Sequence, residues 1–372
     1  MDVVRDSKSN FEALSELLLA TPEAQSRATN GAAVQTVPRV SALRGLTEGQ
    51  FKELEALAIK NHVIVRAFEP LQRSLEHSSN HQIAGLVAYA LGQERGRITH
   101  ALSFLEQICS TFEEYGCPVV VIKSLDHWPD LGSDLDLYTD GEAAIVVEVM
   151  RTRFSAKVAE RSWGDRLANK WNFIVPGLPE LVEVHVGRLG QTGEQTVLTQ
   201  SLQSRTRMTT VAQHSFRALA SEDRFIVSTL QRMYRHFYIR LCDIVDNAHL
   251  LDSQSIDFAL LQSLGSAAGL WEGVATYLTI VSQYVEAYRG FGIPLPSVVT
   301  NSAKFSTNRV HFRRGFLRVP ILPDSVNLYA GELKTLVLRG EIRNSFRLSL
   351  LPGLAAAAAL EMKLTGNDKG IW

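Results

Sequence analysis

The sequence predicts an α+β protein in which a group of strands lies between two helical parts. Short β-branched and alternating segments gather between about residues 117 and 220, and apolar residues repeat at helical spacing before and after them. A chain of 372 residues is long enough for two or three domains. We therefore expect a flexible N-terminal segment (1–46), an N-terminal helical segment (47–116), an α/β core (117–220) and a mainly helical C-terminal domain (221–372).

The first part of the chain carries helix signals on both sides of a polar stretch. Residues 11–19 are amphipathic, whereas the small polar residues of 21–36 predict a flexible segment. Thr47 begins a capping-box pattern that opens a helix. Two further helices are expected at 81–91 and 97–115, the second of which feeds directly into the first strand.

The expected core alternates strands with one helix. A β-branched run at 118–122 predicts a buried strand, and 134–138 predicts a second one. A helix is expected at 142–153. The segments 171–175 and 181–186 are joined by a Pro-Gly turn, which favours an antiparallel hairpin.

The second strand carries two aspartates, Asp134 and Asp136, separated by Leu135. Successive side chains of a strand point to opposite faces, so the two carboxylates share one face. Such close carboxylates repel each other unless a cation lies between them. Hard oxygen ligands suit Mg²⁺, and paired Mg²⁺ ions suit phosphoryl or nucleotidyl transfer.

Two neighbouring segments add chemistry to this pair. The first strand ends in Lys123 and Ser124, a cation followed by a small residue. In the alternating strand 181–186, Glu183 and His185 share a face, so Glu183 could supply a third carboxylate.

These segments resemble the nucleotidyltransferase superfamily with the DNA polymerase β-type fold. More narrowly, they are similar to an uncharacterised bacterial nucleotidyltransferase family with the signature "LKG … SDIDLLV … VDLHW". The corresponding pieces here are Ile122-Lys123-Ser124, Ser133-Asp134-Leu135-Asp136-Leu137 and Val182-Glu183-Val184-His185. A weaker likeness runs from about residue 50 to about residue 350, and it includes a helix at 246–251.

The resemblance implies a polymerase β-type core, a small mixed sheet with helices, at 117–220. It implies transfer of a nucleoside monophosphate from an NTP to an acceptor, with release of pyrophosphate. Asp134, Asp136 and Glu183 would be the catalytic residues and would hold Mg²⁺ or Mn²⁺. The acceptor stays open: it could be a small molecule, a protein or RNA.

The expected nucleotide-binding set comprises Lys123, Ser124, Ser133, Arg232 and Arg235, of which the arginines come from a cationic cluster whose guanidinium groups suit phosphate. The chain departs from the family pattern at two of the positions quoted above. Ser124 stands where the family has Gly, and Glu183 stands where it has Asp. The metal-binding residues therefore match the family better than the phosphate-binding turn does.

Simpler interpretations remain open at each position. The Asp-x-Asp pair and Lys123 could be solvated strand ends, and His185 could be a structural histidine. The basic segments 232–240 and 309–318 could be solvated faces, or they could contact a nucleotide or a polyanionic acceptor. The protein could also be a degenerate nucleotide-binding or partner protein in a biosynthetic complex, or a toxin-like transferase that modifies RNA.

Composition narrows the cellular setting. A formal net charge of −1 gives no strong signal for DNA binding or for a membrane surface. The three cysteines, Cys109, Cys117 and Cys242, show no metal-ligand spacing, and their sparse odd number fits a reducing cytoplasm. The first residues lack an apolar signal core, and the apolar run at 354–360 is too short to span a bilayer.

Overall fold

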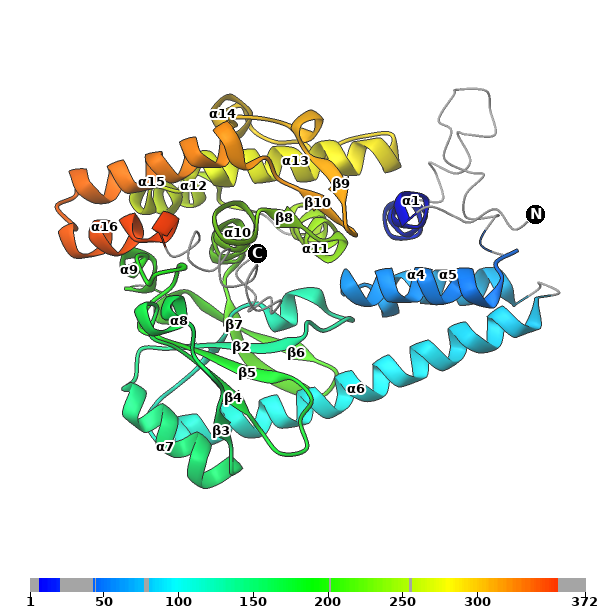
Figure 1. Cartoon of the computed structure of the whole chain (residues 1–372), viewed down its shortest axis with the longest axis horizontal. Helices are drawn as coiled ribbons and strands as arrows, with labels where there is room; N and C mark the ends of the chain where they lie inside the picture. The colour runs from blue at the N-terminus through cyan, green and yellow to red at the C-terminus, as the bar shows by residue number, and fades with distance from the viewer. Residues whose placement is uncertain are drawn as a thin grey trace.

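The protein is an α+β structure built around a mixed seven-stranded sheet (Figure 1). The computed structural model describes residues 7–20, 43, 45–76, 80–200, 202–253 and 256–353. This confirms the predicted α+β class. The finer expectation of a polymerase β-type core stays a prediction, as do the four segment boundaries.

The described N-terminal residues form α1 (Ser7–Leu19), α4 (Glu48–Lys60), α5 (Ile64–Leu75) and α6 (His81–Glu114). Residues 7–19 lie in the segment we expected to be flexible, but they form a helix that packs on α4, α5 and α13 (Trp271–Arg289). The predicted stretch 21–36 lies outside the described residues. The capping box at Thr47 is confirmed.

Helix α6 corrects one expectation, because it is a single helix of 34 residues where two were predicted. No helix breaker interrupts it: Gly92 and Gly96 have only open space around them, and Arg97 pairs with Glu94 one turn earlier. The helix passes beneath the sheet and extends toward α4 and α5 (Figure 1).

The strands of the large sheet are β1 (Val120–Val121), β2 (Asp134–Thr139), β3 (Lys157–Val158), β4 (Lys170–Ile174), β5 (Leu181–Val186), β6 (Thr206–Val211) and β7 (His214–Leu219). Their order is β3-β4-β5-β2-β1-β7-β6. Strand β2 runs parallel to β5, whereas β4 and β5 form the predicted antiparallel hairpin. The parallel pair places two strands far apart in sequence side by side.

Short helices connect these strands: η1 (Ser124–His127), α7 (Ala143–Phe154), α8 (Trp163–Leu167), α9 (Thr196–Thr199) and η2 (Gln203–Arg205). One face of β2 and β5 is apolar and buried, with Leu135, Leu137, Val182 and Val184 in the core. Helices α6 and α7 pack in this core through Leu105 and other apolar side chains. The opposite face therefore carries the polar side chains.

The chain after the sheet is mostly helical. Its helices are α10 (Ser221–Thr229), η3 (Leu230–His236), α11 (Leu241–Ser253), α12 (Phe258–Ala268), α13, α14 (Ser297–Ser302), η4 (Thr307–Arg309), η5 (Ile321–Ser325), α15 (Val326–Leu338) and α16 (Ile342–Ser349). A second sheet consists of β8 (Tyr238–Ile239), β10 (Phe316–Arg318) and β9 (His311–Arg313), in that order.

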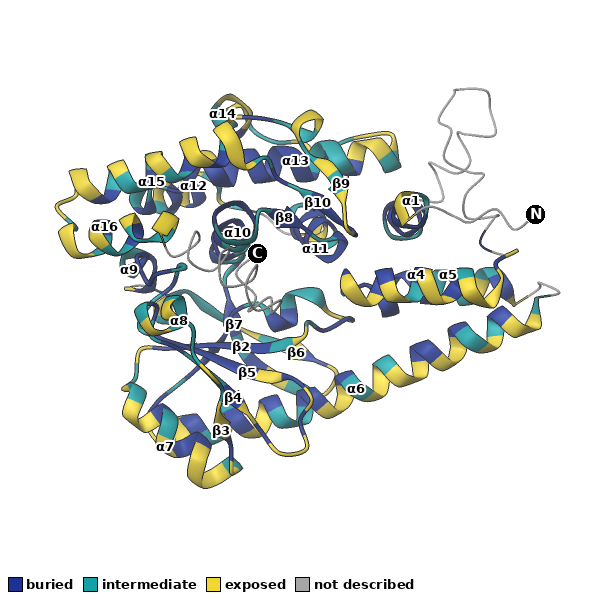
Figure 2. Ribbon diagram, viewed as in Figure 1, coloured by how far each residue is buried: buried dark blue, intermediate teal, exposed yellow. Residues whose placement is uncertain are grey.

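One continuous apolar cluster joins the parts of the molecule (Figure 2). It runs from Phe11 on α1 through Leu137 on β2 to Tyr277 on α13 and Leu328 on α15. Among the described residues, no helix combines the length and the apolarity needed to cross a bilayer.

Candidate active site

Acidic side chains from two parallel strands gather on the polar face of the sheet. Asp134 and Asp136 share this face of β2, and the register places Asp136 beside Glu183 of β5. One ligand atom from each of Asp136, Glu183 and His185 can be chosen so that all three lie within 4.8 Å of one another. Asp134 lies two residues before Asp136, on the same face of β2, and burial and the Glu183 carboxylate raise its pKa.

Two lysines lie among these carboxylates. Lys123 forms a close ion pair with Asp136 and lies 3.4 Å from Glu183 Oε1. Lys170 of β4 reaches Glu183 Oε2 at 2.9 Å and Asp165 at 2.8 Å. A nucleotide-binding role for Lys123 predicts an ammonium opposite the carboxylates, with room for a triphosphate between them, but the ammonium contacts the carboxylates directly. The lysine ammonium groups therefore occupy the space beside the carboxylates that a bound metal ion would need.

The charges of this cluster depend strongly on burial. Burial raises the pKa of Asp136 to about 7. The ion pair with Lys123 lowers this pKa, but the nearby Glu183 and Asp134 carboxylates raise it and so oppose the effect of Lys123. Burial also disfavours ionised Glu183, but Lys123 and Lys170 hold its pKa well below its usual range. The lysines thus favour the ionised form of Glu183, whereas burial favours the protonated form of Asp136.

His185 presents a free acceptor to the site. Its Nε2 lies 2.8 Å from Glu183 Oε1, and burial lowers its pKa to about 4, so the ring is neutral at pH 7. With Nε2–H donated to Glu183, Nδ1 carries a lone pair, and no described residue donates to it. Asn172, paired in register with Glu183, likewise has a buried Oδ1 without a partner in the described part of the chain. The two acceptor atoms, His185 Nδ1 and Asn172 Oδ1, could therefore each bind a donor or a cation.

The predicted phosphate-binding serines differ in position. Ser124 is buried, and its Oγ donates to the Asp134 carbonyl at 3.1 Å and accepts from the Asp136 amide at 2.7 Å. Its hydroxyl therefore fixes β2 against the end of β1 and is not directed at a ligand. Ser133 is exposed, with its Oγ 3.4 Å from Asp134 Oδ2.

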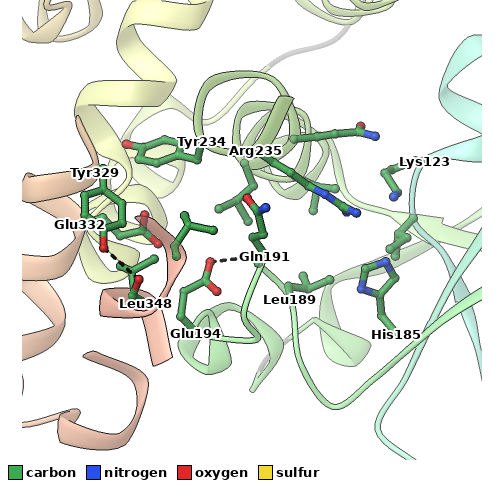
Figure 3. A pocket seen from close by; sticks show the side chains of 16 residues that line it. Lys123, His185, Leu189, Gln191, Glu194, Tyr234, Arg235, Tyr329, Glu332 and Leu348 are labelled. Atoms are coloured by element: carbon green, nitrogen blue, oxygen red, sulfur yellow. Dashed lines mark hydrogen bonds between the residues drawn. The ribbon is translucent and has the colours of Figure 1, made fainter. Parts of the chain in front are cut away.

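The two arginines that were predicted to bind nucleotide lie in different environments. Arg232 is buried and pairs with Asp243 at 2.7 Å, so the structure does not bring it to the site. This corrects its assignment as a nucleotide-binding residue, and its burial also differs from the solvated basic face that was the simpler interpretation of this segment. Arg235 extends toward Lys123 and His185 (Figure 3).

A pocket opens beside the carboxylates. Lys123, His185 and Arg235 line one end, whereas Glu194 and Glu332 line the other (Figure 3). The pocket lies between β5, α10 with η3, and the helices α15 and α16.

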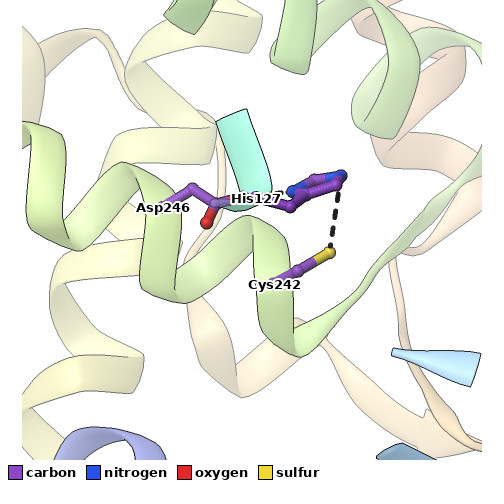
Figure 4. Close-up of side chains that lie close together, drawn as sticks. All are labelled: His127, Cys242 and Asp246. Carbon is purple, nitrogen blue, oxygen red and sulfur yellow. Dashed lines mark hydrogen bonds and ion pairs between the residues drawn. The ribbon is translucent and has the colours of Figure 1, made fainter. Parts of the chain in front are cut away.

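A second group of possible ligands consists of His127, Cys242 and Asp246 (Figure 4). His127 contacts Asp246 through Nδ1, and its Nε2 lies 3.9 Å from Cys242 Sγ. Arg66 also pairs with Asp246, at 2.5 Å, and with Asp130, at 2.9 Å. Since a buried cation already neutralises Asp246, this group is a structural network that joins α5, η1 and α11. The cysteine spacing in the sequence gave no sign of it.

Sequence reasoning missed Lys170, although a signal was present. Lys170 and Asn172 alternate with Trp171 and Phe173, which places both polar residues on the face shared with Glu183. A lysine on the interior face of a strand next to a predicted carboxylate is a plausible ion-pair partner.

No protein-family model, curated protein or solved structure matches the chain. Function is therefore inferred from the residues at the site.

Proposed function

We propose that the protein is a metal-dependent nucleotidyltransferase that moves a nucleoside monophosphate from an NTP to an acceptor. The observation that carries this proposal is the register of β2 and β5, which brings the carboxylates of Asp136 and Glu183 together with Asp134 on the same face. Cytoplasmic location belongs to the same proposal.

The donor set fits a hard divalent cation. Asp134, Asp136 and Glu183 offer carboxylate oxygens, the hard ligands that such a cation prefers. When bound, Mg²⁺ or Mn²⁺ would neutralise phosphate charge and lower the pKa of the attacking group. For this to happen, the Lys123 ammonium would have to leave Asp136, and that movement would free it for a phosphate.

The protein's own side chains would position the reactants. Lys123 and Arg235 would hold the triphosphate at one end of the pocket, where arginine suits bidentate phosphate contacts. His185 Nδ1 would accept a hydrogen bond from the acceptor. A bond would form between the acceptor atom and the α-phosphorus, the α–β phosphoanhydride bond would break, and the acceptor proton would pass to solvent as pyrophosphate leaves. Positioning would supply much of the rate.

The test is label transfer from NTPs in a cell extract with Mg²⁺ or Mn²⁺. We expect α-labelled NTP to give a labelled product and γ-labelled NTP to give labelled pyrophosphate. Asp136→Asn should abolish both signals, whereas Asp140→Asn, a matched change just beyond β2, should leave them unchanged. Transfer of the γ-label to the product, or no transfer at all with any NTP, would contradict the proposal.

A second candidate is a protein that binds nucleotide without turnover. The observation that favours it is the neutralisation of Asp136 and Glu183 by Lys123 and Lys170, which leaves the pair stable without a metal. In that case, NTP would bind with equal affinity in Mg²⁺ and in EDTA, and no label would be transferred.

A further inference from the structure

The fold brings the two basic segments of the sequence into one surface. Strand β8 pairs with β10, so that Arg318 lies opposite Tyr238 although the residues are far apart in the chain. The buried side chain of Asn61 ties three segments together: Nδ2 donates to the Gly315 carbonyl, and Oδ1 accepts from the Leu241 amide, each at 3.0 Å. The end of α4, the start of α11 and the β9–β10 turn are thereby fixed beside one another.

Three cations surround a stacked aromatic pair on this surface. The rings of Tyr238 and Phe316 stack with centroids 4.3 Å apart. Lys60 Nζ lies 4.6 Å from the Phe316 centroid, and Arg318 lies 5.1 Å from the Tyr238 centroid. Arg240 lies 5.5 Å from the Tyr238 centroid. The rings hold the cations by cation–π attraction and so fix their positions.

These cations have no acidic partners in the described part of the chain. Lys60, Arg240 and Arg318 appear in no ion pair there, and neither does the neighbouring Arg314, whose carbonyl accepts from Lys60 at 2.7 Å. Burial lowers the pKa of Lys60, and Arg318, Arg314 and Arg240 lower it further. Gathering like charges without a counter-charge is unfavourable, and an anionic ligand would remove this repulsion.

The basic surface is connected to the carboxylate site through His236. Its ring lies 5.4 Å from that of Tyr238. Burial lowers the pKa of His236, and among the cations that lower it further are Arg235, Arg240 and Lys123. His236 therefore lies between the cations of both regions.

We propose that Lys60, Arg240, Arg314 and Arg318 bind a phosphate group of the acceptor substrate. The phosphate site follows from the geometry, whereas its role as an acceptor site depends on the proposed nucleotidyl transfer. The proposed reaction assigns Lys123 and Arg235 to the NTP, so a second cationic group suits a second phosphorylated substrate. Guanidinium groups held by aromatic rings match phosphate in shape and charge.

A small phosphorylated ligand fits better than single-stranded RNA. Bases bind such RNA sites by stacking on exposed aromatic rings. Tyr238 and Phe316 are only 8% and 9% exposed, and their faces are covered by each other and by the three cations. Phosphate groups can therefore reach the guanidinium edges, but bases cannot reach the rings.

The test is calorimetric titration of the full chain with pyrophosphate in EDTA, where no metal supports the carboxylate site. We expect saturable binding that weakens about tenfold for each of Arg318→Ala and Arg314→Ala, because each removes a charge-assisted hydrogen bond. Arg151→Ala on α7 is the matched control and should bind as the wild type does. Unchanged affinity in both arginine variants would overturn the proposal. Thermal unfolding would show that they are folded, and Lys60→Gln, on an exposed side chain, provides a milder third variant.

Two further arms identify the source of the phosphate. Saturation with a non-hydrolysable NTP and Mg²⁺ should leave pyrophosphate binding unchanged, and loss of that binding would assign the surface to the NTP and overturn the acceptor role. A short RNA that binds more tightly than pyrophosphate and competes with it would overturn the choice of a small ligand. Because no arm requires turnover, failure of the phosphate site is distinguishable from failure of nucleotidyl transfer.

Discussion

The position of Lys123 decides whether a metal ion can bind between the carboxylates of the site. Strand alternation was sufficient to predict that Asp134 and Asp136 share a face and that Glu183 and His185 share another strand's face. It could not predict that Lys123 would lie between Asp136 and Glu183, because the direction of a side chain at a strand end depends on the loop that follows. The lysine holds the carboxylates together without a metal and would have to move for a metal to bind.

Replacing Lys123 with alanine should destabilise the metal-free protein by about 3 kcal/mol, because it leaves the buried Asp136 without its cation beside Glu183, which keeps Lys170. Mg²⁺ should restore much of that stability, since it would substitute for the missing charge. Thermal unfolding in EDTA and in Mg²⁺ measures both effects. Lys52→Ala, which breaks an exposed pair with Glu48, is the control and should leave the melting temperature nearly unchanged. Equal melting temperatures for wild type and Lys123→Ala in EDTA would contradict this account.

At the scale of elements, a buried network holds α5, η1 and α11 around the site. Arg66 of α5 pairs with Asp246 of α11, and the same carboxylate contacts His127 of η1. Since η1 follows Lys123 directly in the chain, this network fixes the segment that positions the lysine. Asp243 of α11 likewise pairs with the buried Arg232 of η3.

Asp246→Asn should destabilise the protein by about 3–5 kcal/mol, because it leaves the buried Arg66 and His127 without their shared carboxylate. Urea unfolding followed by circular dichroism measures the change. The matched variant Asp252→Asn loses only a more exposed pair with Arg289, and less than about 1 kcal/mol is expected. If both variants unfold at the same urea concentration, the network does not support the fold.

His127 should also make stability depend on pH. Burial would lower its pKa, but the Cys242 sulfur and the Asp246 carboxylate raise it well above its usual range. The folded-state pKa is thus higher than the unfolded value of about 6.5. The stabilisation is therefore complete below about pH 6.5 and is lost as pH rises through the folded-state pKa.

The variant His127→Gln isolates this contribution. Its free energy of unfolding should fall less than that of the wild type as the pH is raised from about 6 to about 9. Other titratable or charged groups lie around His127: Arg66, His62 and Asp126 of the same turn. The His62 ring stacks on the His127 ring, with 5.8 Å between their centroids. These other groups are present in both proteins, so the difference between the two pH profiles reports His127. Parallel profiles would contradict the assignment.

Local pattern explains which elements were predictable. The hairpin of β4 and β5 was predictable because alternation and a Pro-Gly turn lie within sixteen contiguous residues, 171–186. The pairing of β8 with β10 was not, because strands of two and three residues carry no periodic signal and their partners are distant in sequence. For the same reason, the basic surface could not be predicted from segments 232–240 and 309–318 separately.

At the scale of the molecule, the parts share one core. Phe11 of the N-terminal helix, Leu137 of the sheet and Tyr277 of the C-terminal part belong to the same apolar cluster. The expected segment boundaries describe changes of secondary structure along the chain, whereas the packing runs across them. Composition could not reveal this, because long-range packing depends on which apolar faces meet.

The shared core predicts a single unfolding transition for the whole chain. In differential scanning calorimetry, the calorimetric and van't Hoff enthalpies should agree, as expected for cooperative unfolding. A fragment of residues 117–220 should lack cooperative unfolding, because the cluster also needs α6, α10 and α13. Two separate transitions in the full chain, or a cooperatively folded fragment, would show that the parts are independent.

Nucleotidyl transfer at this site requires a divalent cation, which the carboxylates of β2 and β5 would hold. The most direct measurement is Mn²⁺ binding followed by electron paramagnetic resonance, in which bound Mn²⁺ loses the signal of the free ion. We predict saturable binding by the wild type, strong loss in Asp136→Asn and in Glu183→Gln, and no change in Asp140→Asn. Equal Mn²⁺ binding by wild type, Asp136→Asn and Glu183→Gln would contradict the account.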